Sequence, residues 1–136
     1  MPSRKQIEDT LRTHFEAWNA GDRERWLANW RDDAVMADPV GGPVKQGRAA
    51  LEHTWERSFQ PGHHWRIEPV FMQICEDQAA LHVRNRGTID GAPVELDSIE
   101  IYWVDDAGKI FRVQTYFAPP EGRTLDPFFM PVRGPA

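Results

Sequence analysis

The sequence of 136 residues contains a single cysteine, Cys75. One cysteine excludes an internal disulfide and is consistent with a reducing compartment, so we expect a cytoplasmic protein. Long apolar runs are also lacking, since no window approaches the roughly 18 apolar residues of a membrane-spanning helix. We therefore expect no contact with a membrane.

Basic charge is scarce and scattered along the chain. The 16 Lys and Arg residues face 21 Asp and Glu residues, which gives a formal net charge of −5. A nucleic-acid-binding surface normally has a clustered basic face, whereas Arg4-Lys5 and Arg84/Arg86 are the closest basic groupings in this sequence. Nucleic acid is therefore not an expected partner.

Several motifs of known chemistry are missing as well. The sequence has no Gly-rich phosphate loop, no nucleophile elbow and no Cys/His pairing, so covalent hydrolysis is not indicated. His63-His64, taken with His53 or His82, shows no ligand spacing and no acid at a fixed offset, which favours a solvated loop pair over a metal site. We expect neither a metal nor a cofactor.

Apolar residues, by contrast, make up 40% of the chain and include six Trp, enough for the core of one domain and for a pocket. The first part of the chain predicts three helices. The first is expected to begin at Ser3 as N-cap and to end at about Ala20. Its buried stripe has helical spacing, with His14 on the same face as Ile7, Leu11, Phe15 and Trp18. The second helix is expected over Asp22 to Trp30, with Asp32 and Asp33 as surface acids at its end, and the third from Arg48 to about Gln60.

From His63 onward the pattern changes to strands. Four long segments are expected over 64–76, 78–89, 94–104 and 109–118, joined by hairpin signals such as Asp105-Asp106-Ala107-Gly108. Helices followed by an antiparallel meander predict an α+β fold, with the helices on one face of a curved, mostly antiparallel sheet. The Pro- and Gly-rich end of the chain is expected to be irregular.

The most informative stretch is Ala34-Val35-Met36-Ala37-Asp38-Pro39-Val40-Gly41. Pro39 favours extended geometry for the residue before it, so Asp38 is expected to close a short strand. A carboxylate held among apolar residues is partly desolvated, and this strengthens it as a base. The alternative interpretation is an ordinary turn-forming Asp, because Asp-Pro before Gly-Gly is common turn chemistry.

The order of the motifs resembles a known family. Trp18-Asn19-Ala20-Gly21-Asp22, Arg31-Asp32-Asp33-Ala34-Val35, Asp38-Pro39-Val40-Gly41, Gly47-Arg48-Ala49-Ala50 and Asp106-Ala107-Gly108-Lys109-Ile110 together resemble the ketosteroid isomerases of the nuclear transport factor 2-like (SnoaL-like) superfamily. The resemblance covers about residues 5 to 118. It implies a cone-shaped, barrel-like domain over residues 1–122, followed by an irregular tail over 123–136.

The resemblance also implies an activity. In that family the acid before Pro-Val-Gly is the general base that moves a proton between two carbons near a ketone, and Asp38 holds that position. An oxyanion hole stabilises the enolate oxygen through a first-helix tyrosine and a protonated acid on the third strand. Counting back from Asp106-Ala107-Gly108-Lys109 places Glu100 in register with that acid, and a turn one residue longer would select Asp97 instead. The two lie on opposite faces of the strand.

His14 replaces the first-helix tyrosine in this comparison. A neutral imidazole donates one hydrogen bond, so His14 is a candidate donor to the enolate oxygen, and a buried core histidine is the alternative. Trp18, Trp30, Trp55 and Phe117 are expected to wall the cavity, with plain core packing as the alternative for each. Tyr102 shares the face of Glu100 and is either a substrate contact that supplies the missing phenol or part of a subunit contact.

Ile99, Ile101 and Trp103 form an apolar row on the opposite face, which predicts a homodimer through the outer face of the sheet. The predicted function is that of a cofactor-independent isomerase that acts on an apolar, steroid-like ketone. Three alternatives stay open: a non-catalytic small-ligand binding domain, a polyketide cyclase or dehydratase, and water addition to an epoxide. The last needs an Asp-Arg-Asp arrangement that the sequence does not clearly provide.

Overall fold

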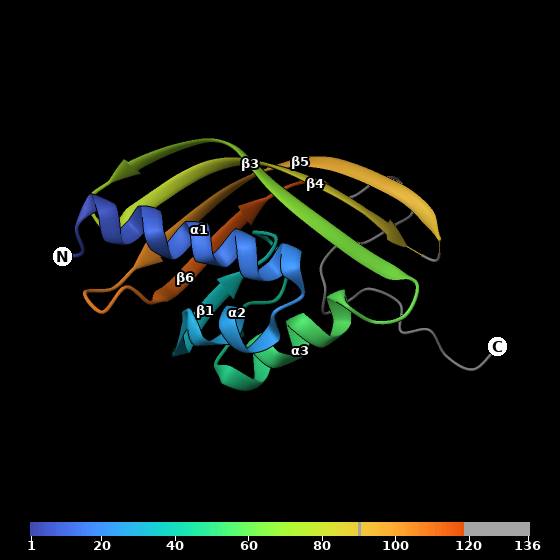
Figure 1. Cartoon of the computed structure of the whole chain (residues 1–136), viewed down its shortest axis with the longest axis horizontal. Helices are drawn as coiled ribbons and strands as arrows, with labels where there is room; N and C mark the ends of the chain where they lie inside the picture. The colour runs from blue at the N-terminus through green and yellow to red at the C-terminus, as the bar shows by residue number, and fades with distance from the viewer. Residues whose placement is uncertain (90, 119–136) are drawn as a thin grey trace.

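The computed structural model describes residues 1–89 and 91–118 of the chain. The boundary expected at residue 122 and the irregular tail expected over 123–136 lie outside these residues. Within them the chain folds into three helices and six strands (Figure 1). The α+β prediction is confirmed: the helices pack on one face of an open, strongly curved sheet.

Helix α1 spans Arg4–Ala20, as its capping residues predict. The Ser3 side chain accepts a hydrogen bond from the Gln6 amide, and the Gln6 side chain accepts one from the Ser3 amide, which together form a capping box. Gly21 ends the helix in a left-handed conformation, with φ of 68°. The apolar stripe of α1 is buried together with His14, so this helix brings an imidazole into the core.

Helix α2 is shorter than the sequence predicts. It spans Arg23–Ala28, with Asp22 as N-cap, and the chain is already extended at Trp30. Strand β1 covers Trp30–Ala37, so Asp32 and Asp33 lie within a strand and do not end a helix. Their exposure explains the error, because exposed acids carry the same polar signal on a strand edge as at a helix terminus. Helix α3 spans Arg48–Ser58.

The sheet has the strand order β2-β1-β6-β5-β4-β3. The remaining strands are β2 (Lys45–Gln46), β3 (His63–Cys75), β4 (Gln78–Ile89), β5 (Ala92–Val104) and β6 (Ile110–Tyr116). Strands β3 to β6 form the predicted antiparallel meander, and β1 pairs with β6 in parallel. Only the two-residue β2 had no signal in the sequence. The parallel pairing brings the end of β1 beside the end of β6.

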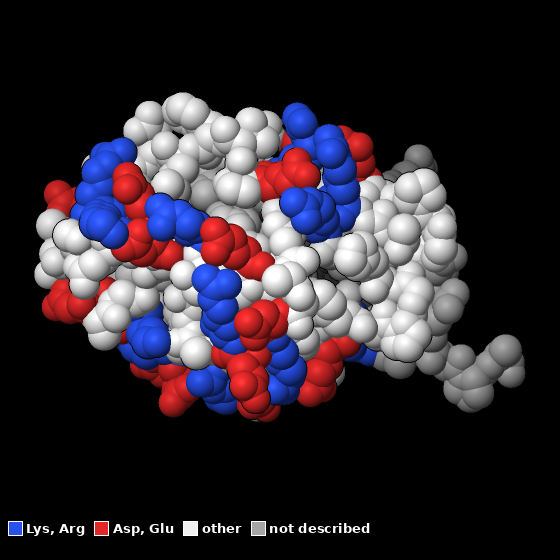
Figure 2. Space-filling view, in the orientation of Figure 1, with Lys and Arg blue, Asp and Glu red and all other residues white. Residues whose placement is uncertain are grey.

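The long strands β3, β4 and β5 arch over the helices, and α1 lies across their concave side (Figure 1). The core between the two layers is rich in tryptophan, with Trp18, Trp26, Trp30, Trp55 and Trp65 all buried. On the surface seen in Figure 2, acidic and basic side chains are interspersed. In the part of the chain that the structure describes, no helix combines the length and the apolar character needed to cross a membrane.

Candidate active site

A cavity of about 110 Å³ lies between the helices and the concave face of the sheet. Its closed end is formed by the buried side chains of His14, Trp30 and Tyr102. Its open side is marked by lining residues that are only half-buried, among them Asp38 and Phe117. The lining is mostly aromatic and aliphatic with a few polar groups, which is typical of a small-molecule site.

Asp38 follows the last residue of β1 and lines this cavity. Because side chains alternate along a strand, it shares a face with Met36, which also lines the cavity. Thr115 on β6 donates a hydrogen bond of 2.5 Å to Asp38 Oδ1. Lys45 donates to the Asp38 carbonyl oxygen at 3.0 Å, and the Val40 amide donates to the Thr115 carbonyl oxygen at 2.9 Å. The carboxylate is thus held at the rim by a neighbouring strand.

Glu100 lies on the inner face of β5, directly across from Thr115 on β6. It is 7% exposed and lines the cavity. Asp97, the alternative acid, lies on the outer face, where its side chain is 60% exposed and contacts His82 at 2.9 Å. Strand parity decides between the two acids, and Asp97 does not reach the cavity.

Two hydroxyl groups hold the Glu100 carboxyl group. Tyr102 donates to Glu100 Oε1 at 2.5 Å, and Ser98 donates to Oε2 at 2.7 Å. Burial raises the pKa of Glu100 to about 7; the two hydrogen bonds oppose this shift, and the charge of Asp38 adds to it. Burial, followed by the charge of Glu100, also raises the pKa of Tyr102 well above its usual value, so the phenol stays protonated. Glu100 is therefore a carboxyl group that exists in both protonation states near neutral pH.

His14 joins this cluster from α1. Burial lowers the pKa of His14 to about 3, so the ring is neutral. Trp26 Nε1 lies 3.2 Å from His14 Nδ1 and is only a donor, so Nδ1 must accept. The ring proton then lies on Nε2, which donates to Tyr102 Oη at 3.0 Å. The hydrogen bonds run in one direction, from Trp26 through His14 and Tyr102 to Glu100. Both nitrogens of His14 are engaged, so the imidazole acts through Tyr102 and has no free donor for a ligand.

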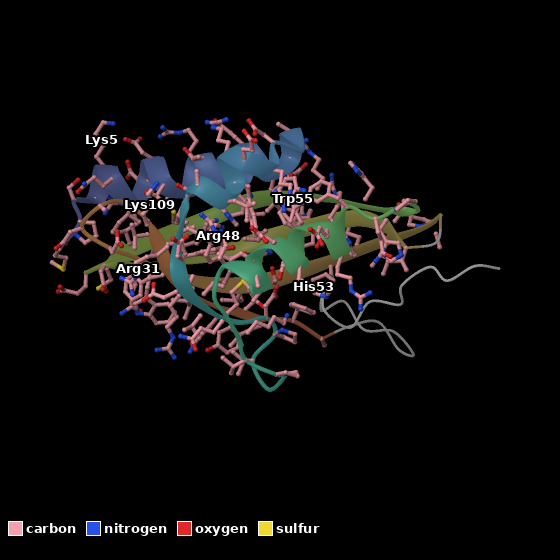
Figure 3. The ribbon with its side chains drawn as sticks, turned by 90° about the horizontal axis from the view of Figure 1, so that it is seen from below. Lys5, Arg31, Arg48, His53, Trp55 and Lys109 are labelled. Carbon is pink, nitrogen blue, oxygen red and sulfur yellow. The ribbon has the colours of Figure 1, made fainter. Side chains whose placement is uncertain are left out.

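The expected wall residues divide into two groups. Trp18, Trp30 and Phe117 line the cavity. Trp55 is absent from the lining and stacks on Phe59, with ring centroids 4.1 Å apart. It lies between α3 and α1 (Figure 3), where it packs against Trp18 with a centroid distance of 5.4 Å. The structure thus places Trp55 in the core between the helices, because helical spacing gives the buried side of α3 but not which layer that side contacts.

Sequence reasoning missed Trp65 and Thr115 in the lining. Trp65 occupies space that is open because residue 87 on β4 is a glycine. A Cβ atom on Gly87 would lie 2.7 Å from the Trp65 ring. Thr115 was hidden because its role depends on the pairing of β6 with β1. The one available signal was that Thr115 lies two residues before Phe117, so both side chains are expected on the same face of the strand. Among the described residues, no three His, Cys, Asp or Glu side chains are grouped so as to hold a metal ion.

The arrangement thus combines two acids in different environments. Asp38 is half-buried at the rim, with one oxygen bound by Thr115. Glu100 lies deeper, within an unbroken chain of neutral hydrogen-bonding groups. A pair of this kind provides a base and a neutral acid in the same apolar space, which is what proton transfer next to a polarised oxygen requires.

Comparison with known proteins agrees with this architecture. The family model described as the SnoaL-like domain matches residues 11–113. Among solved structures, the epoxide hydrolase/cyclase-like enzyme SalBIII has a role in pyran ring formation in the polyether salinomycin. It aligns with a TM-score of 0.80 at 21% identity over 87% of this chain and 95% of that one.

Two further similar structures are of proteins that bind steroid ligands. RV0760c from Mycobacterium tuberculosis, solved in complex with estradiol-17beta-hemisuccinate, aligns with a TM-score of 0.73 at 21% identity over 83% of this chain and 94% of its own. A computationally designed 17-OHP binder aligns with a TM-score of 0.77 at 21% identity, over 84% and 92% of the two chains. At such identities these likenesses show the shared fold.

Proposed function

The chain belongs to the SnoaL-like domain family of the nuclear transport factor 2-like superfamily, and we propose that it is a cofactor-independent isomerase of apolar ketones. The observation that supports this proposal most is the pair of acids in one cavity, with Asp38 at the rim and Glu100 buried at 7% exposure. The substrate class is a β,γ-unsaturated ketone on a flat, steroid-like or polycyclic skeleton, which suits aromatic walls.

The reaction begins with removal of a proton from the carbon between the carbonyl group and the double bond. Asp38 takes this proton, the C–H electron pair forms the dienolate, and negative charge develops on the ketone oxygen. Asp38 then returns the proton to the γ carbon, so the double bond moves into conjugation and no atom is gained or lost. A positioned carboxylate base contributes roughly 10²–10⁴-fold to such a step.

Protonated Glu100 is the donor to the developing enolate oxygen. Its proton is carried by Oε2, because Oε1 already accepts the short bond from Tyr102. Ser98, which donates to Oε2 when Glu100 is ionised, has a second acceptor in the Val83 carbonyl oxygen at 3.4 Å. Tyr102 and His14 are positioning residues in this scheme. They differ from the sequence-based hypothesis, in which His14 itself donates to the enolate.

The cavity is smaller than a steroid-sized ligand, so its open side must widen when such a ligand binds. Its volume of about 110 Å³ is below the roughly 300–1,000 Å³ of sites that enclose drug-sized ligands. Binding of a steroid-sized ketone therefore involves outward movement of half-buried residues on the open side, such as Phe117. The closed end, with Tyr102 and Glu100, already has its hydrogen bonds in place.

The second part of the proposal is a homodimer through the outer face of the sheet. Phe71, His82, Ile99 and Tyr116 are direct cross-strand neighbours from β3 to β6 and form one continuous row. Phe71 is 61% exposed, Ile99 50% and Tyr116 44%. A row in which three of four side chains are exposed and apolar or aromatic is typical of a subunit contact when it lies on an outer face.

The test of the isomerase proposal is direct. Androst-5-en-3-one is incubated with the purified protein in deuterated and ordinary buffer, and the appearance of the conjugated enone is followed by ultraviolet absorbance. The proposal predicts turnover in both buffers, and mass spectrometry of the product then shows how much of the transferred hydrogen comes from the substrate. Steroid binding without turnover would contradict it and support the binding-domain alternative.

A further inference from the structure

Two tryptophans of the cavity wall carry indole N–H groups without an acceptor. Trp30 is 4% exposed and Trp65 is 6% exposed. Both line the cavity, and within residues 1–89 and 91–118 neither Nε1 atom has a hydrogen-bond partner. An unpaired buried donor costs about 1–3 kcal/mol. Native structures have few such groups, and one beside a cavity points to a ligand or a water molecule that satisfies it.

The other tryptophans of the wall behave differently. Trp18 Nε1 donates to the Trp65 carbonyl oxygen at 3.2 Å, and Trp26 Nε1 donates to His14 Nδ1 at 3.2 Å. The fold therefore satisfies the indole N–H groups of these two wall tryptophans. The unpaired state of Trp30 and Trp65 is specific to these two positions.

Thr54 on α3 provides a third unpaired group. A threonine inside a helix commonly donates to the carbonyl oxygen four residues earlier. Ser58, one turn later, does so, with 2.8 Å to the Thr54 carbonyl oxygen. The Thr54 hydroxyl is buried, lines the cavity, and has no partner among the described residues. Thr54 is thus a third residue of the cavity wall with a polar group that no described residue satisfies.

The three groups approach the cavity from different elements. Trp30 begins β1 and Trp65 lies on β3, and strands β6, β5 and β4 separate these two in the sheet. Thr54 comes from α3, which faces the sheet. Trp30 belongs to the closed end, since its ring centroid lies 5.7 Å from that of His14 and 6.4 Å from that of Tyr102. A single ligand oxygen at the closed end therefore cannot accept hydrogen bonds from both Trp30 and Trp65, because the two tryptophans lie on opposite walls of the cavity.

We propose that the ligand of this cavity carries at least one acceptor oxygen beyond the reacting carbonyl, and that Trp65, Thr54 and Trp30 recognise its oxygens. The inference rests on the proposed function in taking the same cavity as the substrate site, and it narrows the substrate class. Indole N–H groups only donate, so the complementary ligand groups are carbonyl, ether or hydroxyl oxygens. The preferred substrate is therefore an oxygenated polycyclic ketone, which binds more tightly than a ketone on a hydrocarbon skeleton.

One test needs no ligand. Thr54→Val keeps the side-chain shape and removes only the hydroxyl, and Thr54→Ser keeps the hydroxyl as the matched control. If the hydroxyl is unpaired, the valine variant melts about 3 °C higher than wild type, while the serine variant gains nothing. A lower melting temperature for Thr54→Val would show that the hydroxyl already has a partner, and it would overturn the assignment of Thr54.

A second test measures binding by calorimetry with defined probes. Androst-4-en-3-one is compared with three diones that differ from it by one carbonyl, on ring B, C or D. We expect at least one dione to bind wild type about tenfold more tightly, and Trp65→Phe and Thr54→Val to remove that gain while the affinity for the mono-ketone stays within about twofold. Trp103→Phe on the outer face is the control. Equal binding of all four probes to wild type would overturn the proposal.

These readouts separate this inference from the isomerase proposal. Melting temperature and affinity do not depend on turnover, and the 4-en-3-one probes are already conjugated. An inactive protein that prefers a dione through Trp65 keeps the inference and rejects the isomerase. An active isomerase that binds all probes equally keeps the activity and rejects the recognition of a second oxygen.

Discussion

Tyr102 Oη lies 2.5 Å from Glu100 Oε1 and 3.0 Å from His14 Nε2, so one phenol joins the neutral imidazole to the buried acid. The phenol donates to Glu100 and accepts from His14, and Trp26 fixes that direction because its indole only donates. One hydrogen-bonded chain therefore joins His14 on α1 to Tyr102 and Glu100 on β5. In the proposed mechanism Tyr102 tunes the acidity of Glu100.

The first prediction concerns this tuning. Tyr102→Phe removes a hydrogen bond that lowers the pKa of Glu100, so the pKa of Glu100 should rise and the alkaline limb of the pH–rate profile should move upward. The maximal rate should fall about tenfold, because the neutral acid becomes a weaker donor. Tyr116→Phe, on the outer face and outside the cavity lining, is the control. A lower rate with an unmoved alkaline limb would assign Tyr102 a merely structural role.

The second prediction is the pH dependence of activity. The pKa of Glu100 is raised to about 7, and the mechanism uses its protonated form. kcat/KM should therefore level off below pH 7 and should fall about tenfold per pH unit above it. Glu100→Gln keeps a neutral donor at all pH values, so its alkaline limb should disappear. An activity that rises above pH 7 in wild type would contradict the protonated role.

The third prediction concerns stability. The pKa of Glu100 is raised from 4.5 to about 7, so the folded state binds more protons and stability from this group falls between these values as pH rises. The pKa of His14 is lowered from 6.5 to about 3, so its contribution rises over that range. The two slopes oppose each other between pH 4.5 and 6.5.

Denaturant unfolding of His14→Gln tests this cancellation. The amide offers an acceptor to Trp26 and a donor to Tyr102 but does not titrate. The free energy of unfolding should decrease with rising pH in this variant between pH 4.5 and 6.5, where wild type is nearly flat. A variant with the same pH profile as wild type would show that His14 is not held neutral.

The fourth prediction tests the outer row. Ile99→Lys places a charge among Phe71, His82 and Tyr116, so two copies of the row should no longer pack together. Sedimentation at micromolar concentration should show a dimer for wild type and a monomer for the variant. The exposed Val44→Lys serves as the control. A wild-type monomer would remove the dimer proposal.

The sequence predicted most of the fold because its signals are local. Helical spacing and the Ser3 cap defined α1, and the turn Asp105-Asp106-Ala107-Gly108 defined the last hairpin. Asp38 was selected by its Pro-Val-Gly motif and Glu100 by its register with the turn that follows β5, and both side chains line the cavity. The errors lie where local signals are ambiguous, as at Asp32, where exposed acids give the same pattern in a strand and at a helix end.

The rest of the site depends on contacts between elements. Trp26 Nε1 meets His14 only once α2 has folded back onto α1, and Thr115 meets Asp38 only through the parallel pairing of β6 with β1. No spacing in the sequence distinguishes Trp55, which stacks on Phe59, from tryptophans of the cavity wall. Such roles depend on how the elements pack against one another, and the hydrophobic periodicity of the sequence does not predict them.

The central claim is that Asp38 is the base. Asp38→Asn preserves the shape of the side chain and an acceptor for Thr115, but it removes the group that takes the proton. The conversion of androst-5-en-3-one by wild type, Asp38→Asn and the exposed control Asp33→Asn should be measured under single-turnover conditions. The account predicts a fall of about 10²–10⁴-fold for Asp38→Asn alone, with steroid affinity retained. Turnover by Asp38→Asn at the wild-type rate would contradict it.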